Sequence, residues 1–166
     1  MVTGALPRLT EDLPNVQWLH LCGPHDLAEV KKTYGITCLR SAVHNFFHDM
    51  PSALGAADLV ISRSGASSLA ELAAAKVPAI LVPLPTAADD HQRANARAAA
   101  KSGAVIVLEE TETTSDAFTE QVVGLISDTG RLMEMANAMK SLDRPGAAKL
   151  IAARILETCE KRAIDS

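Results

Sequence analysis

Aromatic side chains are scarce in this chain of 166 residues: they make up 3 % of it, and Trp18 is the sole indole. A core must therefore be built from aliphatic side chains, and platforms for stacking bases or sugars are nearly absent. Positive charge is not in excess either, because 16 Lys and Arg stand against 20 Asp and Glu. With a net charge of −4 the chain offers no general basic field, and we expect no nucleic-acid partner.

Cysteines and long apolar runs are also few. The three cysteines are odd in number, far apart and without a C-x-x-C pair, which argues for a reducing compartment and against a disulfide framework or zinc knuckle. The most apolar stretch, residues 73–84, is broken by a lysine and two prolines, so we expect neither a signal peptide nor a spanning helix. These features predict a cytoplasmic protein and leave a peripheral membrane surface open.

Motifs of several enzyme classes are missing. The sequence has no G-x-G-x-x-G and no Walker loop, and Ser64 stands in R-S-G rather than in G-x-S-x-G. Dehydrogenases, P-loop ATPases and serine hydrolases therefore lose support. His44 and His48 lie four residues apart, as metal ligands can, but they bracket a strand end and no carboxylate completes a zincin pattern, so we expect no metal site.

What the sequence does contain is an alternation of short β-branched or aliphatic runs with alanine-rich stretches of helical period. This pattern is typical of βα units around a parallel sheet that is buried on both faces. The predicted strands are residues 16–21, 38–43, 59–62, 79–82 and 105–108. The predicted helices are residues 26–33, 51–56, 67–76, 90–102, 115–127, 130–140 and 146–161.

The expected fold is therefore α/β, a Rossmann-like doubly wound parallel sheet of about five strands with a helical C-terminal tail that packs beside the sheet. Residues 1–166 show no repeat, low-complexity block or flexible linker, which predicts a single domain. Residues 1–13 read as the end of a helix, with no strand before them, so the chain begins one βα unit later than a doubly wound domain does.

The segment 59–72 is the richest in chemistry. A buried strand runs into a turn of very small residues and then into a helix, which would aim free backbone N–H groups and the positive helix end at the crevice above the strand. Such a turn can cradle a diphosphate, with serine hydroxyls as extra donors. The same residues have a structural explanation, because Ser68-x-x-Glu71 is also a capping box that only satisfies the first N–H groups of the helix.

A second polar turn, residues 82–95, follows the next strand. The helix beginning near residue 90 presents His91, Gln92 and Asn95 close to its start, where they could hydrogen-bond sugar hydroxyls. Both turns lie at the carboxyl ends of strands, where open α/β sheets bind ligands. The alternative is that Asp89 or Asp90 is an ordinary N-cap and that the remaining side chains form a solvated first turn.

With both turns in place, the sequence resembles the C-terminal donor-binding domain of the MurG family, GT-B glycosyltransferases of family 28 that make lipid II in bacterial cell-wall synthesis. The resemblance extends from about residue 5 to the final helix and rests on several motifs in the family's order. These motifs are residues 57–66 (A-D-L-V-I-S-R-S-G-A), Glu71, 78–85 (P-A-I-L-V-P-L-P), 90–92 (D-H-Q), 95–96 (N-A) and 103–104 (G-A).

The resemblance implies a binding site for UDP-N-acetylglucosamine, with no metal in the nucleotide site and no cofactor. The backbone at Phe47 would meet the uracil, and residues 66–70 would cradle the diphosphate. Glu71 would hold the ribose hydroxyls, while His91 and Gln92 would reach the sugar. The predicted substrate-binding residues are Phe47, Arg63, Ser64, Gly65, Ala66, Ser67, Ser68, Leu69, Ala70, Glu71, His91, Gln92 and Asn95.

The resemblance also implies which parts of the family's enzyme have no counterpart in residues 1–166. The family's N-terminal domain, with its acceptor-side loops and general base, has no counterpart here, so we expect no catalytic residue in this chain and no catalysis by it alone. The first strand of the family's C-terminal sheet, with its Gly-Gly-Ser loop, is missing too. The family strand order 3-2-1-4-5-6 would then keep a gap or close to 2-1-3-4-5. We expect closure, because free strand edges invite association; a neighbouring chain in the gap is the competing prediction.

Two functions follow from the resemblance. In the first, the chain is the donor-binding portion of a hexosyltransferase that moves N-acetylglucosamine, with inversion, onto lipid-linked muramoyl pentapeptide, converting lipid I to lipid II. The full enzyme would be peripheral on the cytoplasmic face of the plasma membrane. In the second, the chain is a stand-alone nucleotide-sugar-binding subunit that needs a separate membrane-bound acceptor partner.

Overall fold

The helices and strands alternate as expected in a computed structural model that describes residues 1–86 and 90–164. Each predicted strand and helix is present and begins within two residues of its expected start, which confirms the α/β fold class. The elements in chain order are α1 (Val2–Asp12), β1 (Gln17–Leu21), α2 (Leu27–Gly35), β2 (Arg40–His44), α3 (Met50–Ala56), β3 (Val60–Ser62), α4 (Ala66–Ala75), β4 (Ala79–Leu81), α5 (His91–Ala100), β5 (Val105–Val107), α6 (Ser115–Ser127), α7 (Thr129–Met139) and α8 (Ala147–Ile164).

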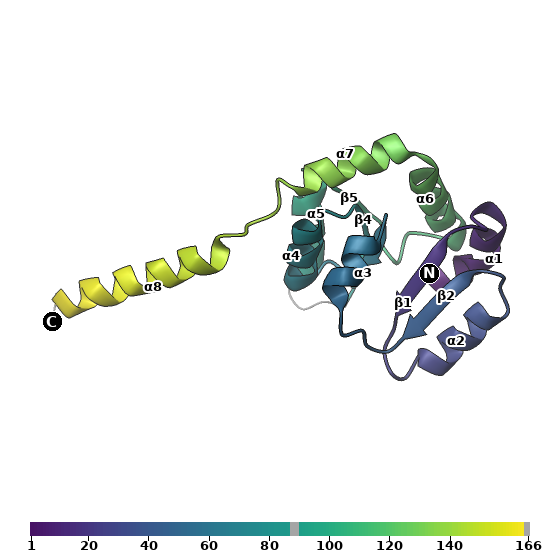
Figure 1. The fold of residues 1–166 in the computed structure, drawn as a ribbon, viewed down its shortest axis with the longest axis horizontal. Helices are drawn as coiled ribbons and strands as arrows, with labels where there is room; N and C mark the ends of the chain where they lie inside the picture. The colour runs from purple at the N-terminus through teal and green to yellow at the C-terminus, as the bar shows by residue number, and fades with distance from the viewer. Residues whose placement is uncertain (87–89, 165–166) are drawn as a thin grey trace.

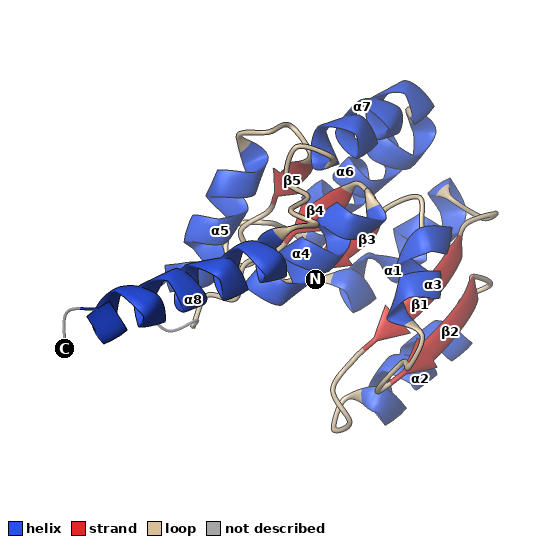
Figure 2. Ribbon diagram, turned by 60° about the vertical axis from the view of Figure 1, so that its left-hand side comes forward, coloured by secondary structure: helices blue, strands red, loops and turns tan. Residues whose placement is uncertain are grey.

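The strands form two parallel sheets instead of one. β1 pairs with β2, starting with Gln17 opposite Arg40, while β3, β4 and β5 form a second sheet in that order. Figure 2 shows the two groups of red strands apart, with β1 and β3 at their facing edges. The expected closure to a 2-1-3-4-5 sheet is therefore wrong: over the described residues no ladder joins β1 to β3.

A shared apolar core holds the two sheets together. Leu6 and Leu9 of α1 and Phe118 of α6 are fully buried, and they belong to one cluster with side chains of both sheets, among them Val43 of β2 and Ile80 of β4. The cluster also takes in Leu59 and Ile61, so side chains before and within β3 pack against it as well. Burial of apolar surface is the main driving force of folding, so this common core keeps the two sheets together although no ladder joins β1 to β3 over the described residues.

A second core lies on the opposite face of the three-stranded sheet. Leu81 of β4 and Leu72 of α4 are buried there, together with small residues such as Ala96 and Ala99 of α5. All of β4 is buried, as expected for a central strand covered on both faces. Because β3 and β4 are parallel, the helices that follow them, α4 and α5, both begin at the carboxyl edge of the sheet.

The helical tail packs on the body only in part. Phe118 and Val122 of α6 and Met135 of α7 are buried, as expected of helices that pack beside the sheet. The last helix, α8, stands away from the body as the yellow rod of Figure 1. Its Leu150 and Ile155 are 64 % and 58 % exposed, so the expectation that the whole tail packs beside the sheet is wrong for α8. Its apolar side chains find no facing surface in the part of the chain that the structure describes.

Candidate functional site

The turn between β3 and α4 presents free backbone amides. Gly65 is the N-cap of α4, with φ −63° and ψ 149°, and no side chain caps the helix start. The first hydrogen bond of the helix runs from Leu69 N–H to Gly65 C=O at 3.0 Å. The N–H groups of Ala66, Ser67 and Ser68 therefore precede the hydrogen-bonded ladder, at the positive end of the helix. Ala66 and Ser67 are exposed, so this end is open to a ligand.

The capping-box interpretation of this turn is wrong. Because α4 begins at Ala66, Ser68 is its third residue and Glu71 its sixth, too far along the helix for the box geometry. The Glu71 side chain is exposed, and no hydrogen bond or ion pair engages it within the described residues. Its carboxylate is thus available one turn above the free amides, and the structural explanation that competed with ligand binding no longer applies.

Ser64 links the two predicted ligand turns from inside. It is fully buried, its hydroxyl donates to the carbonyl of Gln92 at 2.8 Å, and its own carbonyl accepts from Asn95 Nδ2 at 3.1 Å. The expectation that the Ser64 hydroxyl is an extra donor to a diphosphate is therefore wrong, since its only proton is already used. Ser64 and Asn95 instead join the β3 turn to the first turn of α5.

The first turn of α5 is ordered by other contacts. Asp90 occupies the N-cap with φ 56° and no side-chain cap bond, and its carboxylate pairs with Arg93 at 3.1 Å. Gln92 accepts the backbone N–H of Leu84 at its Oε1, at 3.0 Å, which ties α5 to the exit of β4. His91 is exposed at the start of the helix. The alternative N-cap, Asp89, lies outside the described residues.

Two arginine–glutamate pairs brace the same edge, and sequence reasoning missed their acidic members. Arg63 Nη1 donates to Glu110 at 2.8 Å, and Arg93 Nε donates to both carboxylate oxygens of Glu109 at 3.1 Å. The hydrogen bond from Arg63 lowers the pKa of Glu110, and the bond to Glu109 raises the pKa of Arg93. Two consecutive acids directly after the predicted strand 105–108 were the available signal.

Phe47 lies on the loop after β2, which belongs to the other sheet. Its half-buried ring meets His44 edge-on, with centroids 5.8 Å apart. Beneath the same sheet, Tyr34 is 3 % exposed and its hydroxyl lies 3.1 Å from His20 Nδ1. Burial raises the pKa of Tyr34 to about 12 and lowers that of His20. The structure thus collects the residues of both turns into one frame and leaves Phe47 on a separate element.

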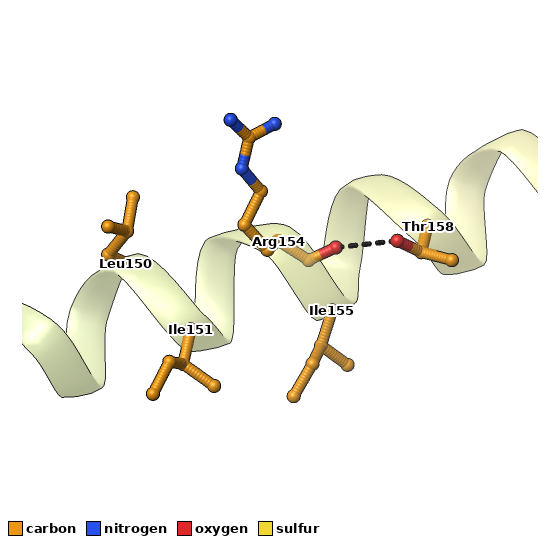
Figure 3. A pocket seen from close by; sticks show the side chains of 5 residues that line it. All are labelled: Leu150, Ile151, Arg154, Ile155 and Thr158. Atoms are coloured by element: carbon orange, nitrogen blue, oxygen red, sulfur yellow. Dashed lines mark hydrogen bonds between the residues drawn. The ribbon is translucent and has the colours of Figure 1, made fainter. Parts of the chain in front are cut away.

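A shallow hollow elsewhere on the surface is not a second site. It lies along α8, and all five side chains that line it come from that one helix, as Figure 3 shows. Leu150 and Ile155 point away from the helix axis on its surface, and the dashed bond between Thr158 and the Arg154 carbonyl is internal to the helix. Without a wall from another element the hollow cannot enclose a ligand.

The fold and these two turns define a class: an open parallel α/β domain whose polar loops gather at the carboxyl ends of its strands. The chain belongs to the glycosyltransferase family 28 C-terminal domain family, whose model matches residues 1–151. The resemblance to the MurG family that the motifs indicated is confirmed by similar proteins of known name and by a solved structure.

The chain is 38 % identical over 161 residues to a UDP-N-acetylglucosamine--N-acetylmuramyl-(pentapeptide) pyrophosphoryl-undecaprenol N-acetylglucosamine transferase of Anaeromyxobacter sp. (strain Fw109-5), a match that covers 97 % of this chain and 42 % of the relative. It is 48 % identical over 111 residues to the enzyme of the same name from Chlorobaculum parvum, covering 67 % and 30 %. The crystal structure of MurG from Acinetobacter baumannii superposes with a TM-score of 0.79 at 32 % identity, over 93 % of this chain and 46 % of that one. The chain spans less than half the length of these relatives.

Proposed function

We propose that this chain is the UDP-N-acetylglucosamine-binding part of a hexosyltransferase that passes N-acetylglucosamine to a lipid-linked muramoyl pentapeptide, the step from lipid I to lipid II in peptidoglycan synthesis. The observation that carries the proposal is the uncapped start of α4, with Glu71 unengaged above it, in a chain whose relatives are named for this donor and acceptor. An anion belongs at such a helix end, where free N–H groups and the helix dipole act together.

The donor is expected to lie across the two braced turns. Within the predicted segment 66–70, beside Gly65, the free amides of residues 66–68 hold the diphosphate, with the Ser67 and Ser68 hydroxyls close by. The Glu71 carboxylate accepts the ribose hydroxyls. His91 and Gln92 at the start of α5 reach the sugar. Because Gln92 Oε1 already accepts a hydrogen bond from Leu84 N–H, the side-chain nitrogen Nε2 is the atom that donates to the sugar.

The remaining predicted contacts extend this site at its ends. The backbone at Phe47 meets the uracil across the gap between the two sheets. Three of these residues support the site without contacting the donor through their side chains, because their hydrogen bonds go to the neighbouring turns: Arg63, Ser64 and Asn95. Leu69 and Ala70 contribute small or apolar surface beside the diphosphate. No group of this chain is assigned to the chemical step, and neither metal nor cofactor is part of the proposal.

The acceptor and the catalytic base are assigned to the part of the relatives that this chain does not span. The relatives' names include an undecaprenol-linked substrate, which supports action at a membrane. Peripheral association of the whole enzyme with the cytoplasmic face is part of the proposal. Among the helices over the described residues, none is both long and apolar enough to cross a membrane.

Titration calorimetry with UDP-N-acetylglucosamine, UDP and UDP-glucose tests the proposal. We expect saturable binding that prefers UDP-N-acetylglucosamine over UDP-glucose, and a loss of at least about tenfold in affinity in Glu71→Gln, which keeps the shape but not the charge that accepts two hydroxyls. Glu120→Gln, an exposed carboxylate on α6, is the matched control and should bind as the wild type does. Absence of binding at millimolar donor, or full affinity in Glu71→Gln, contradicts the proposal.

A further inference from the structure

Three strand exits meet at one guanidinium. Arg63, in the turn after β3, uses Nη1 to donate to the carbonyls of Val82 and Pro83 after β4, at 3.2 and 3.4 Å. The same nitrogen donates to Glu110 Oε2, after β5, at 2.8 Å. Arg63 directly precedes Ser64 and Gly65, so whatever holds its side chain also holds the turn that carries the free amides.

A second arginine does the same for the other turn. Arg93 follows Gln92 in the first turn of α5, and its Nε donates to both oxygens of Glu109 at 3.1 Å. Its Nη1 pairs with Asp90 at 3.1 Å. Glu109 and Glu110 are neighbours in sequence just after β5, so one short segment of chain grips one arginine from each turn.

These two ion pairs affect the geometry of the turns more than the stability of the fold. The side chains of Arg63 and Glu110 are 44 % and 36 % exposed, and ion pairs of that exposure contribute little to folding stability. The two turns are already joined at the inside by Ser64 and Gln92. The acids add a brace at the outside, which fixes the angle and spacing between the turns. A binding site depends on such spacing to a fraction of an ångström.

We propose that Glu109 and Glu110 are positioning residues. By holding Arg93 and Arg63 respectively, they set the distance between the turn from β3 to α4, called the diphosphate turn, and the start of α5, called the sugar turn. The inference rests on the proposed function, because it assigns the two turns to two parts of one nucleotide-sugar. Neither acid touches the donor. Their effect is therefore largest on a ligand that spans both turns and smaller on a ligand that occupies only one.

The double variant Glu109→Gln/Glu110→Gln tests the brace, with affinities for UDP-N-acetylglucosamine and for UDP measured by calorimetry. We expect the affinity for UDP-N-acetylglucosamine to fall about tenfold and that for UDP by about twofold or less, because only the sugar of the donor reaches the start of α5. The melting temperature should change by no more than about 2 °C. Backbone amide signals of Gly65 and Gln92 should shift in the free variant. The single variants should each show part of the effect if the double variant folds poorly.

The matched control is Glu134→Gln/Glu157→Gln, which removes two exposed ion pairs, with Arg131 on α7 and with Arg154 on α8. It should leave both affinities and the signals of the two turns unchanged. An equal loss of affinity for UDP and UDP-N-acetylglucosamine in the test variant, or no loss for either, overturns the positioning role of Glu109 and Glu110. The proposed donor site still stands in that case if Glu71→Gln weakens donor binding. No binding by the wild type overturns the donor site and the brace together.

Discussion

A substitution at Gly65 should distinguish the proposed role of the β3 turn in ligand binding from its role in folding stability. Its φ of −63° is open to any residue, and a Cβ placed on it meets only Ser68 Oγ, at 3.7 Å, an ordinary contact. Gly65→Val should therefore fit without moving its neighbours. Valine is a poorer N-cap than glycine, but it also lowers the entropy of the unfolded chain, and these effects oppose each other. We expect the free energy of unfolding to fall by no more than about 1 kcal/mol.

The same substitution should be severe for the ligand. A branched side chain at the N-cap stands in front of the amides of Ala66 and Ser67, where a diphosphate must come within hydrogen-bond distance of the backbone. Loss of even one charge-assisted bond corresponds to about 1.5 to 3 kcal/mol, so we expect the affinity for UDP-N-acetylglucosamine to fall at least about tenfold. A substitution that the fold tolerates and the ligand does not is what we expect of a phosphate site built from backbone amides.

Two measurements on Gly65→Val test whether the backbone of this turn binds the diphosphate. Denaturant unfolding followed by the fluorescence of Trp18, the sole tryptophan, gives the stability, and calorimetry gives the affinity. Gly124→Val on α6, where a Cβ meets nothing within 4 Å, is the control and should bind donor as the wild type does. Unchanged affinity in Gly65→Val would refute the cradle, because no diphosphate can then lie against these amides.

Two further predictions concern buried polar groups. Ser64→Ala removes the hydroxyl that joins the two turns, and should lower the free energy of unfolding by about 1 kcal/mol; full stability in urea titration would show that the bond to Gln92 is unimportant. Tyr34, the sole tyrosine, should ionise near pH 12 instead of 10.0, read directly from tyrosinate absorbance. Since the folded pKa is the higher one, its contribution of about 2 to 3 kcal/mol is complete below pH 10 and is lost as the pH rises toward 12. A midpoint near 10 with unchanged Trp18 fluorescence contradicts this.

The sequence by itself determined the elements and the family. Periodicity placed each strand and helix to within two residues at its start, because backbone preference and the spacing of apolar side chains act over about ten residues at a time. The small residues of the β3 turn identified an exposed helix start for the same local reason. The motifs in residues 57–104 were specific enough to indicate the family that the comparisons then confirmed.

Only the tertiary structure decided which side chains of the two turns are exposed and which are engaged by other parts of the protein. Ser64 and Gln92 are 28 residues apart, and Arg63 and Glu110 are 47 apart, so their bonds exist only once β3, β4 and β5 lie side by side. The split of the sheet was equally inaccessible to local pattern, because whether β1 pairs with β3 is not decided within either segment. Pairing and packing join residues that are distant in the chain, and their outcome is set by the whole core rather than by any one segment.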